Sequence, residues 1–342
     1  MNSLWKRMTA TVPASFLAAL LLAGGFLAFV AWDQSHWWRV KEDYSFGWLV
    51  PVFVAFVIYD RWPKILATLT ECAADGSRRA AGWHKWLLRL VAGASLAFGA
   101  LMFLLGSFYR AGAGTSQPGT LAITLGAVGI LLPLLWLNAP TLADAVEGGP
   151  EASRHAPGTI FTDARVRLAG LFLFPVLVWL VSAPMVSAVE TQVNLALLRY
   201  IVTAVAFVFD LLGLPLEQQG NVLALPTGNV GVEDACSGIR SLTGCLFAGS
   251  FLAATFLDSL WKKIALVSAA LVLALLTNLG RSLFLTAWAY RYGPHAIEGT
   301  VHDVAGYAVL GLTVVGLLCL LPIFNLKLTL DDSASEPAKS ES

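Results

Sequence analysis

A cysteine stands at the start of a long apolar stretch, within the segment GVEDACSGIRSL at residues 231–242. Asp234 belongs to the residue types that cap helices, so we expect Cys236 in the first turn of the helix that follows. A thiol in that turn lies near the positive end of the helix dipole and near unpaired backbone amides, and both stabilise the thiolate. The sequence therefore predicts a nucleophile at Cys236. The alternative is a small buried cysteine that only packs.

Charged residues surround this cysteine. Glu233 and Asp234 oppose a thiolate by repulsion, and they either cap the helix or contact a substrate. Arg240 comes one helical turn after Cys236 and therefore lies on the same helix face, where it could hold the thiolate or a carboxylate of the substrate. Cys245 falls on the opposite face, and we expect it to pack.

The spacing of the cysteines does not suit a metal. The four cysteines include no CxxC pair and no Cys/His cluster with zinc spacing. The net charge is zero, which gives no reason to expect a nucleic-acid partner. We predict no metal site, no cofactor and no nucleic-acid binding.

A second polar pair interrupts the apolar segment LLTNLGRSLFLTAW at residues 275–288. Asn278 and Arg281 are three residues apart and share one helix face. An ionisable residue at membrane depth is costly, which makes Arg281 a candidate functional residue. The alternative is an arginine whose side chain extends to the lipid headgroups.

The third element is GTVHDVAGY at residues 299–307. Thr300 is a suitable helix cap, which places His302 and Asp303 in the first turn, with Gly306 on the same face as His302 and able to admit a close neighbour. Histidine is the usual carrier of protons near neutral pH. The alternative is a histidine satisfied at the membrane interface.

Composition shows which elements must position these residues. Of the 342 residues, 57% are hydrophobic and 13% are charged, whereas soluble domains carry about a quarter charged residues. A membrane-spanning helix takes roughly 20 apolar residues. We predict an all-α polytopic transmembrane helical bundle with about eight spans. The expected spans are 12–32, 46–60, 86–106, 119–138, 166–186, 238–257, 263–287 and 303–324.

The distribution of basic residues sets the expected topology. The apolar stretch 193–214 carries Arg199 and Asp210, and we predict that it is a re-entrant or interfacial helix. With both termini in the cytoplasm and this stretch not crossing, most of the 22 basic residues lie on the inner side. The run 12–32 is then an uncleaved first span rather than a signal peptide.

Under this topology Cys236, Arg281 and His302 fall at the outer ends of three consecutive spans. A thiol, a fixed cation and a proton carrier on one face meet the requirements of nucleophilic acyl transfer. Two alternatives remain open. A multi-pass transporter or channel would use the buried ions as a conduction path and 193–214 as a broken helix, and a membrane acyltransferase would use the histidine alone.

Three blocks, VEDACSGIRSL, NLGRS and HDVAG, occur in the order that resembles the signature of the exosortase/archaeosortase family. That signature has a Cys in CSG, an Arg shortly after an Asn, and a His before the last helix. The likeness extends to VETQVN at 189–194 and, more loosely, to DYSFGWLVP at 43–51. The resemblance implies Cys236 as the nucleophile, Arg281 as the arginine and His302 as the acid or base. The supporting candidates are Asn278, Arg240, Asp234, Glu233 and Asp303.

The resemblance to this family implies that the chain is an integral membrane enzyme that acts on exported proteins with a C-terminal sorting signal. Such a signal consists of a short motif of the PEP-CTERM kind, one membrane helix and a basic tail. We expect a cysteine protease and transpeptidase that cleaves the signal through a thioester and transfers the protein to a cell-surface glycan or lipid, or to water. The expected location is the cytoplasmic membrane, with the active site at the outer face.

The chain departs from the family pattern at one block. Many bacterial members carry YSHG where this chain has YSFG at 44–47, which leaves the subfamily and its recognised motif open. The fused C-terminal accessory domain of some members is not found. We predict one transmembrane domain over 1–330, with a core signature region over 186–324, and a flexible polar tail over 331–342.

Overall fold

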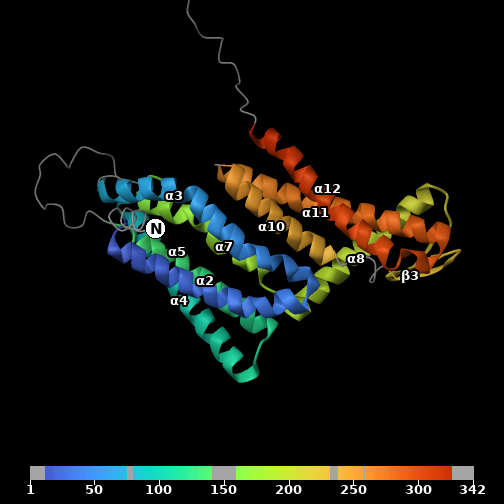
Figure 1. The fold of residues 1–342 in the computed structure, drawn as a ribbon, viewed down its shortest axis with the longest axis horizontal. Helices are drawn as coiled ribbons and strands as arrows, with labels where there is room; N and C mark the ends of the chain where they lie inside the picture. The colour runs from blue at the N-terminus through green and yellow to red at the C-terminus, as the bar shows by residue number, and fades with distance from the viewer. Residues whose placement is uncertain (1–11, 75–79, 141–158, 232–237, 258, 326–342) are drawn as a thin grey trace, which may run out of the picture.

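The computed structural model describes residues 12–74, 80–140, 159–231, 238–257 and 259–325. These residues form a bundle of long helices with one small sheet at its end (Figure 1). Eight helical stretches among them are long and apolar enough to cross a membrane. The predicted polytopic helical bundle with about eight spans is confirmed.

The helices form two groups along the chain, before and after the sheet. In apolar surroundings a helix is favoured because it satisfies its own backbone polar groups. The first group is α2 (Ala14–Val40), the 3₁₀ helix η1 (Glu42–Leu49), α3 (Val50–Ala74), α4 (Trp83–Ala113), α5 (Gln117–Leu137), α6 (Ala164–Leu171), α7 (Leu173–Ser182) and α8 (Ser187–Leu211). The second group is α10 (Gly238–Phe256), α11 (Leu260–Tyr292), the 3₁₀ helix η2 (Pro294–Ile297) and α12 (Thr300–Asn325).

Two segments differ from the expected list of spans. Most of the segment 193–214, predicted to be re-entrant or interfacial, belongs to α8, a continuous helix of 25 residues that is one of the eight stretches. The expected span 46–60 is divided between η1 and α3. Helix α3 continues to Ala74 and carries Asp60, Arg61 and Lys64 in its middle, and it is not among the eight.

A three-stranded antiparallel sheet follows α8, and the sequence interpretation missed it. Its strands are β1 (Glu217–Gln219), β2 (Val222–Leu225) and β3 (Gly228–Gly231), in that order. Gln219 pairs with Val222, so Gly220 and Asn221 form a two-residue turn, and Gly220 has a φ of 64°. A Gly-Asn pair between such runs is a hairpin signal that could have revealed the sheet.

A hydrophobic core fixes the sheet end of the second helix group. Buried residues of α8 at helical spacing pack against Leu223 of β2, Leu285 of α11 and Ala305 of α12. The α8 residues are Leu198, Ile201, Val202, Val205 and Phe209. Helices α10, α11 and α12 run side by side from this end (Figure 1). The core therefore holds α11 and α12 in a fixed relation.

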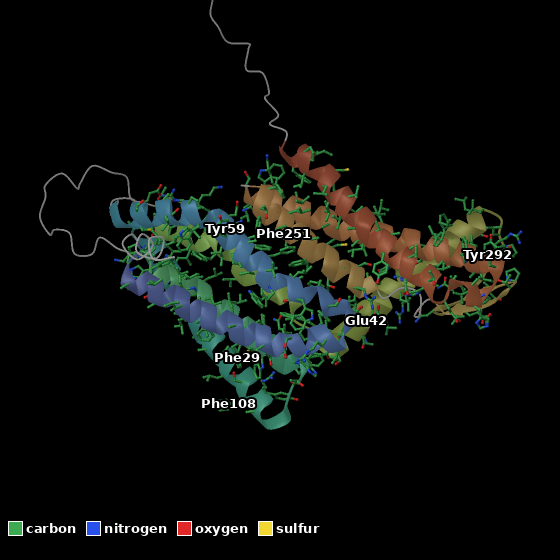
Figure 2. All side chains as sticks on the ribbon, in the orientation of Figure 1. Phe29, Glu42, Tyr59, Phe108, Phe251 and Tyr292 are labelled. Carbon is green, nitrogen blue, oxygen red and sulfur yellow. The ribbon has the colours of Figure 1, made fainter. Side chains whose placement is uncertain are left out.

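Aromatic stacking joins α10 to the first helix group. The rings of Phe53 on α3 and Phe251 on α10 are stacked with centroids 4.3 Å apart. Figure 2 labels Phe251 on its helix. Phe53 also stacks on Phe247, and Phe46 of η1 contacts that same ring with centroids 5.3 Å apart. Aromatic pairs of this kind add to the energy of burial. They fix the position of the helix that follows the predicted nucleophile.

Helix α4 is attached to the bundle mainly through α5. A Cβ atom on Gly126 of α5 would lie 2.4 Å from the Phe103 backbone nitrogen, and one on Gly99 of α4 would lie 2.8 Å from Gly129. Glycine at both positions thus permits the close approach of the two helices. The rest of α4 is largely exposed, and its end projects from the bundle with the turn into α5 (Figure 1).

Candidate active site

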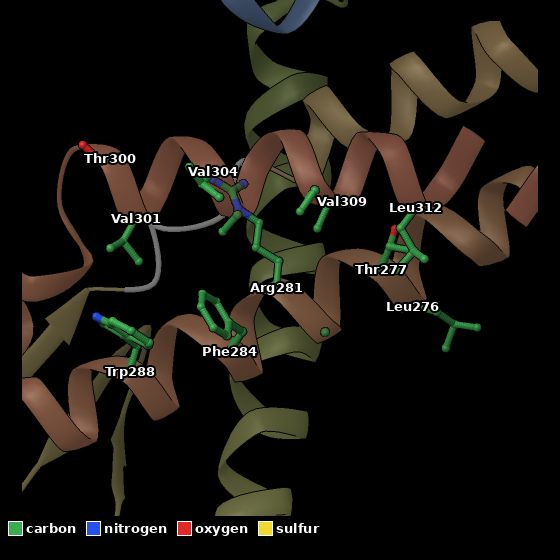
Figure 3. A pocket seen from close by; sticks show the side chains of 13 residues that line it. Leu276, Thr277, Arg281, Phe284, Trp288, Thr300, Val301, Val304, Val309 and Leu312 are labelled. Carbon is green, nitrogen blue, oxygen red and sulfur yellow. The ribbon is translucent and has the colours of Figure 1, made fainter. Parts of the chain in front are cut away.

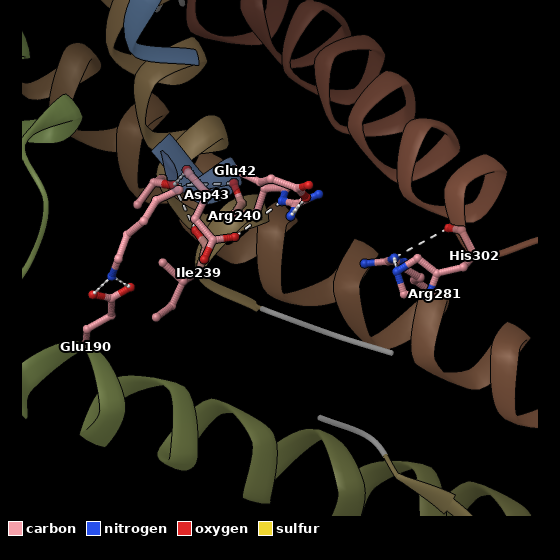
Figure 4. A network of polar contacts seen from close by, with 9 residues as sticks. Glu42, Asp43, Glu190, Ile239, Arg240, Arg281 and His302 are labelled. Atoms are coloured by element: carbon pink, nitrogen blue, oxygen red, sulfur yellow. Dashed lines mark hydrogen bonds and ion pairs between the residues drawn. The ribbon is translucent and has the colours of Figure 1, made fainter. Parts of the chain in front are cut away.

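Arg281 of α11 and His302 of α12 are in direct contact (Figure 4). Nη2 of Arg281 lies 2.9 Å from Nε2 of His302 and 3.5 Å from the His302 carbonyl oxygen. A guanidinium has donors and no acceptor, so Nε2 must accept this hydrogen bond. The ring proton is therefore on Nδ1, and the pair joins a fixed cation to a neutral imidazole.

The turn between α11 and α12 brings these two residues together. Gly293 ends α11 with a φ of 93°, a conformation that favours glycine, and Pro294 opens η2 directly after it. Helix α12 then begins at Thr300 and returns alongside α11. Gly306 faces the pair, since a Cβ atom there would lie 3.5 Å from Nη2 of Arg281.

An apolar groove adjoins Arg281. It has a volume of about 770 Å³ and lies between α11 and α12 (Figure 3). Its lining includes Phe284 and Trp288 of α11 and Val304 and Leu312 of α12. Arg281 is the one charged residue among the described residues that line it. A charged group thus lies within a surface that otherwise suits apolar ligands.

A second, more polar cavity adjoins His302. It has a volume of about 330 Å³ and lies between β3 and η2. Asn229 and Gly231 of β3 line one side, and Glu298 and His302 line another. The Arg281–His302 pair therefore separates an apolar groove from a polar cavity.

Asn278 lies one turn before Arg281 and is buried, with 2% of its surface exposed. Neither atom of its side-chain amide has a hydrogen-bond partner among the described residues. A buried amide without partners is costly, and such groups are rare in proteins. Asn278 is therefore placed beside the pair at a cost in stability.

Cys236, Glu233 and Asp234 lie outside the described residues. The structure describes the chain up to Gly231, which lines the same cavity as His302. It describes the chain again from Gly238, the first residue of α10. The predicted nucleophile thus belongs to the short segment that joins the His302 cavity to α10.

Arg240 has two described partners that the sequence interpretation did not name. Its Nη2 lies 2.5 Å from an oxygen of Glu42, and its Nε lies 3.3 Å from an oxygen of Asp43. Both carboxylates belong to η1, and this cluster is apart from the Arg281–His302 pair (Figure 4). Asp303 lies in the first turn of α12 and is exposed. Neither residue has a described contact with the pair.

Sequence reasoning missed a second polar cluster at η1. Lys41 contacts both carboxylate oxygens of Glu190, at 2.8 and 2.6 Å, and the Gln117 amide donates to the same carboxylate at 2.9 Å. The only sequence signal was the position of Glu190 within the family-like segment VETQVN. This cluster joins α2, α5 and α8.

The segment YSFG supports η1. The buried hydroxyl of Tyr44 accepts a hydrogen bond from the Met185 amide at 3.0 Å, and burial raises the pKa of this tyrosine to about 12. A Cβ atom on Gly47 would lie 2.1 Å from the Trp38 ring, so glycine is required there. Phe46 packs on Phe247, with ring centroids 5.3 Å apart. The tyrosine, the phenylalanine and the glycine of this segment all serve packing.

A comparison with protein families adds one finding. The family model described as transmembrane exosortase matches residues 37–319. This range includes all three sequence blocks that carry Cys236, Arg281 and His302. No curated protein and no solved structure matches the chain significantly.

Proposed function

Because this chain belongs to the transmembrane exosortase family, we propose that it is a cysteine peptidase and transpeptidase that cleaves C-terminal sorting signals of exported proteins. Family membership indicates a membrane sorting enzyme. The observation that carries the finer proposal is the 2.9 Å contact between Arg281 and His302 at the boundary between groove and cavity. A cation that can stabilise an oxyanion and a proton carrier are together there.

The proposed reaction begins at Cys236. The thiol proton passes to Nε2 of His302, which must first part from Arg281, and this separation also frees Nη2 of Arg281. The thiolate attacks the scissile carbonyl, and Arg281 stabilises the oxyanion that forms. The C–N bond then breaks, the leaving amine takes the proton from His302, and the substrate stays on Cys236 as a thioester. The separation of His302 from Arg281 thus makes His302 available as the base and Arg281 available as the oxyanion donor.

The second half of the reaction resolves the thioester. A hydroxyl or amine of a cell-surface glycan or lipid, or a water molecule, loses a proton to His302 and attacks the carbonyl. Cys236 leaves as the thiolate and recovers its proton from His302. Arg240 is bound by the carboxylates of Glu42 and Asp43, so we assign it the positioning of the first turn of α10.

The groove between α11 and α12 suits the membrane helix of the substrate. Its lining is apolar apart from Arg281 and two threonines, and three lining positions are small: Gly280, Ala305 and Ala308. Small residues let a neighbouring helix approach closely within a membrane. A substrate helix in this groove would present the adjoining motif to His302.

The basic residues Lys262 and Lys263 at the start of α11 support a topology for this enzyme. We place them and both termini in the cytoplasm, the chain in the cytoplasmic membrane, and the active site at the outer face. Exported proteins reach that face after translocation, which is where a sorting enzyme meets them.

The test uses proteins of the same genome whose C-terminus carries a short motif, a membrane helix and a basic tail. One such protein is co-expressed with the enzyme, and removal of its tail is followed on immunoblots. The variant Cys236→Ser should leave the substrate uncleaved while remaining in the membrane at normal abundance. The matched control is Cys319→Ser, because Cys319 lies exposed on α12.

A thioester trap gives a second readout. Mass spectrometry of the intact enzyme should find one acylated cysteine, Cys236, and alkylation of that thiol should stop turnover. Full processing by the Cys236→Ser variant would end the proposal. A genome without any matching C-terminal signal would remove the proposed substrate class.

A further inference from the structure

A small basic cavity lies where α4, α5 and α6 meet, away from the Arg281–His302 pair. Its volume is about 180 Å³, and Lys85, Arg89, Trp136 and Arg165 line it. Lys85 and Arg89 are one turn apart on the first part of α4, Trp136 lies near the end of α5, and Arg165 lies near the start of α6. Three cations from two helices thus converge on one space.

The aromatic ring of Trp136 lines the cavity. The guanidinium carbon of Arg165 lies 4.9 Å from the centroid of the Trp136 ring, a cation–π contact. Trp136 is 9% exposed, and its indole N–H has no hydrogen-bond partner among the described residues. A buried donor without an acceptor is costly, and an oxygen of a bound ligand would satisfy it.

The net charge of the cavity is positive. Arg165 is neutralised by Asp163, whose carboxylate it contacts at 2.8 and 3.2 Å. Burial raises the pKa of Asp163, but the hydrogen bonds from Arg165 and from the Ala80 amide outweigh it and hold this pKa below its usual value. Lys85 and Arg89 have no ion pair among the described residues. Two positive charges therefore remain for a ligand.

The surface beside the cavity is apolar. Trp86, Leu90 and Val91 follow Lys85 on α4 and are 70%, 69% and 57% exposed. Trp83, at the start of the same helix, is 67% exposed. Exposed tryptophans at the end of an apolar helix mark the interface between lipid headgroups and hydrocarbon. The cavity is therefore located at headgroup depth, next to a face that contacts acyl chains.

We propose that this cavity binds the phosphate of an anionic phospholipid, with the acyl chains along α4. Lysine and arginine are the residues that bind phosphate oxygens, arginine through two parallel hydrogen bonds. Basic pockets between membrane helices take such headgroups. The volume accommodates a phosphate group, and the apolar face of α4 distinguishes a lipid from a free phosphate ion. The bound lipid would join α4 to α6, and α4 is otherwise attached mainly through α5.

Native mass spectrometry of the purified full-length chain tests the proposal. The chain is delipidated, and phosphatidylglycerol or phosphatidylcholine is titrated. Each cation near an anionic lipid contributes about fivefold in affinity, so the double variant Lys85→Gln/Arg89→Gln should bind phosphatidylglycerol about 25-fold more weakly. Trp136→Phe keeps a ring under Arg165 and removes the N–H, and it should weaken binding about fivefold.

The matched control is Lys262→Gln/Lys263→Gln, which removes the same charge from the start of α11. This variant should bind phosphatidylglycerol like the unmodified chain. An equal loss in both double variants would show general attraction of basic residues to lipid and would overturn the site. Circular dichroism and gel filtration confirm that each variant is folded.

A third arm separates the two sources of phosphate. Inorganic phosphate should not displace bound phosphatidylglycerol, because it lacks the contact with α4. If inorganic phosphate displaces the lipid completely, with the same dependence on Lys85 and Arg89, the ligand is a free anion and the lipid proposal fails. Equal affinity for phosphatidylcholine and phosphatidylglycerol would likewise overturn the role of the two uncompensated cations.

Discussion

Two arginines within apolar helices have opposite surroundings. Arg61 of α3 is 8% exposed and donates to the carbonyl of Leu171 at 2.7 Å and to that of Ala254 at 2.5 Å. Arg281 of α11 contacts the first turn of α12 through His302 and lines an open groove. The first arginine joins three helices, whereas the second lies next to space for a ligand.

The helix ends explain the difference. Leu171 is the last residue of α6, and Ala254 is two residues before the end of α10, so both carbonyls belong to the last four of a helix and have no partner within it. A cation at these negative ends is stabilising. The Arg281 guanidinium instead lies at the positive end of α12, where the dipole disfavours a cation. A cation kept in that place against the dipole suggests function rather than stability.

The largest effect expected from this comparison is on activity at Arg281. Arg281→Gln should lower the rate of signal cleavage by about 10²–10³, the usual consequence of removing an oxyanion donor. Its melting temperature should stay the same or rise, because a cation leaves the positive end of a helix. The measurements are the processing rate of the co-expressed substrate and thermal unfolding in detergent. A variant that cleaves normally, or that fails to fold, would remove the distinction between the two arginines.

Arg61 should show the reverse pattern. Arg61→Met removes two hydrogen bonds from a charged donor and leaves two helix carbonyls without that partner, which should cost about 3 kcal/mol of stability. The rate per folded molecule should stay close to that of the unmodified enzyme. Thermal unfolding followed by circular dichroism measures the loss of stability. Processing of the substrate, normalised to the amount of folded protein, measures the rate per folded molecule. A large fall in the normalised rate would mean that Arg61 also acts on the site.

The sequence predicted that Arg281 and His302 lie near the ends of the last two spans, at one membrane face, and the structure adds that their side chains are in contact. The described partners of Arg240 were not predicted. Arg240 is bound by Glu42 and Asp43, which lie far away in the sequence. No local pattern indicates that η1 returns to the start of α10, because that contact depends on the packing of Phe46 and Phe53.

The sequence interpretation also missed the sheet and did not predict that α8 is one continuous helix. Arg199, Asp210 and the glycine and proline after α8 suggested an interrupted segment, yet its apolar residues repeat at helical spacing and pack as one continuous helix. The strands β1 to β3 are three or four residues long, too short for periodicity to identify. Both elements form because they cover the ends of α11 and α12, which is a tertiary effect.

The smallest effect expected is on the groove beside Arg281. Ala308 lines this groove and is exposed, so Ala308→Trp should fill part of it without disturbing the core. The bulky ring would exclude an apolar helix from close approach, and cleavage should fall about tenfold through KM rather than kcat, because the Arg281–His302 contact stays intact. The matched control is Val315→Trp, since Val315 is 56% exposed on the same helix and does not line the groove. If both variants lose activity equally, a tryptophan on α12 disturbs the helix itself. If neither variant loses activity, the substrate reaches Arg281 through the polar cavity and not through the groove. Arg281 would then differ from Arg61 in its catalytic role but not in lying next to a binding groove.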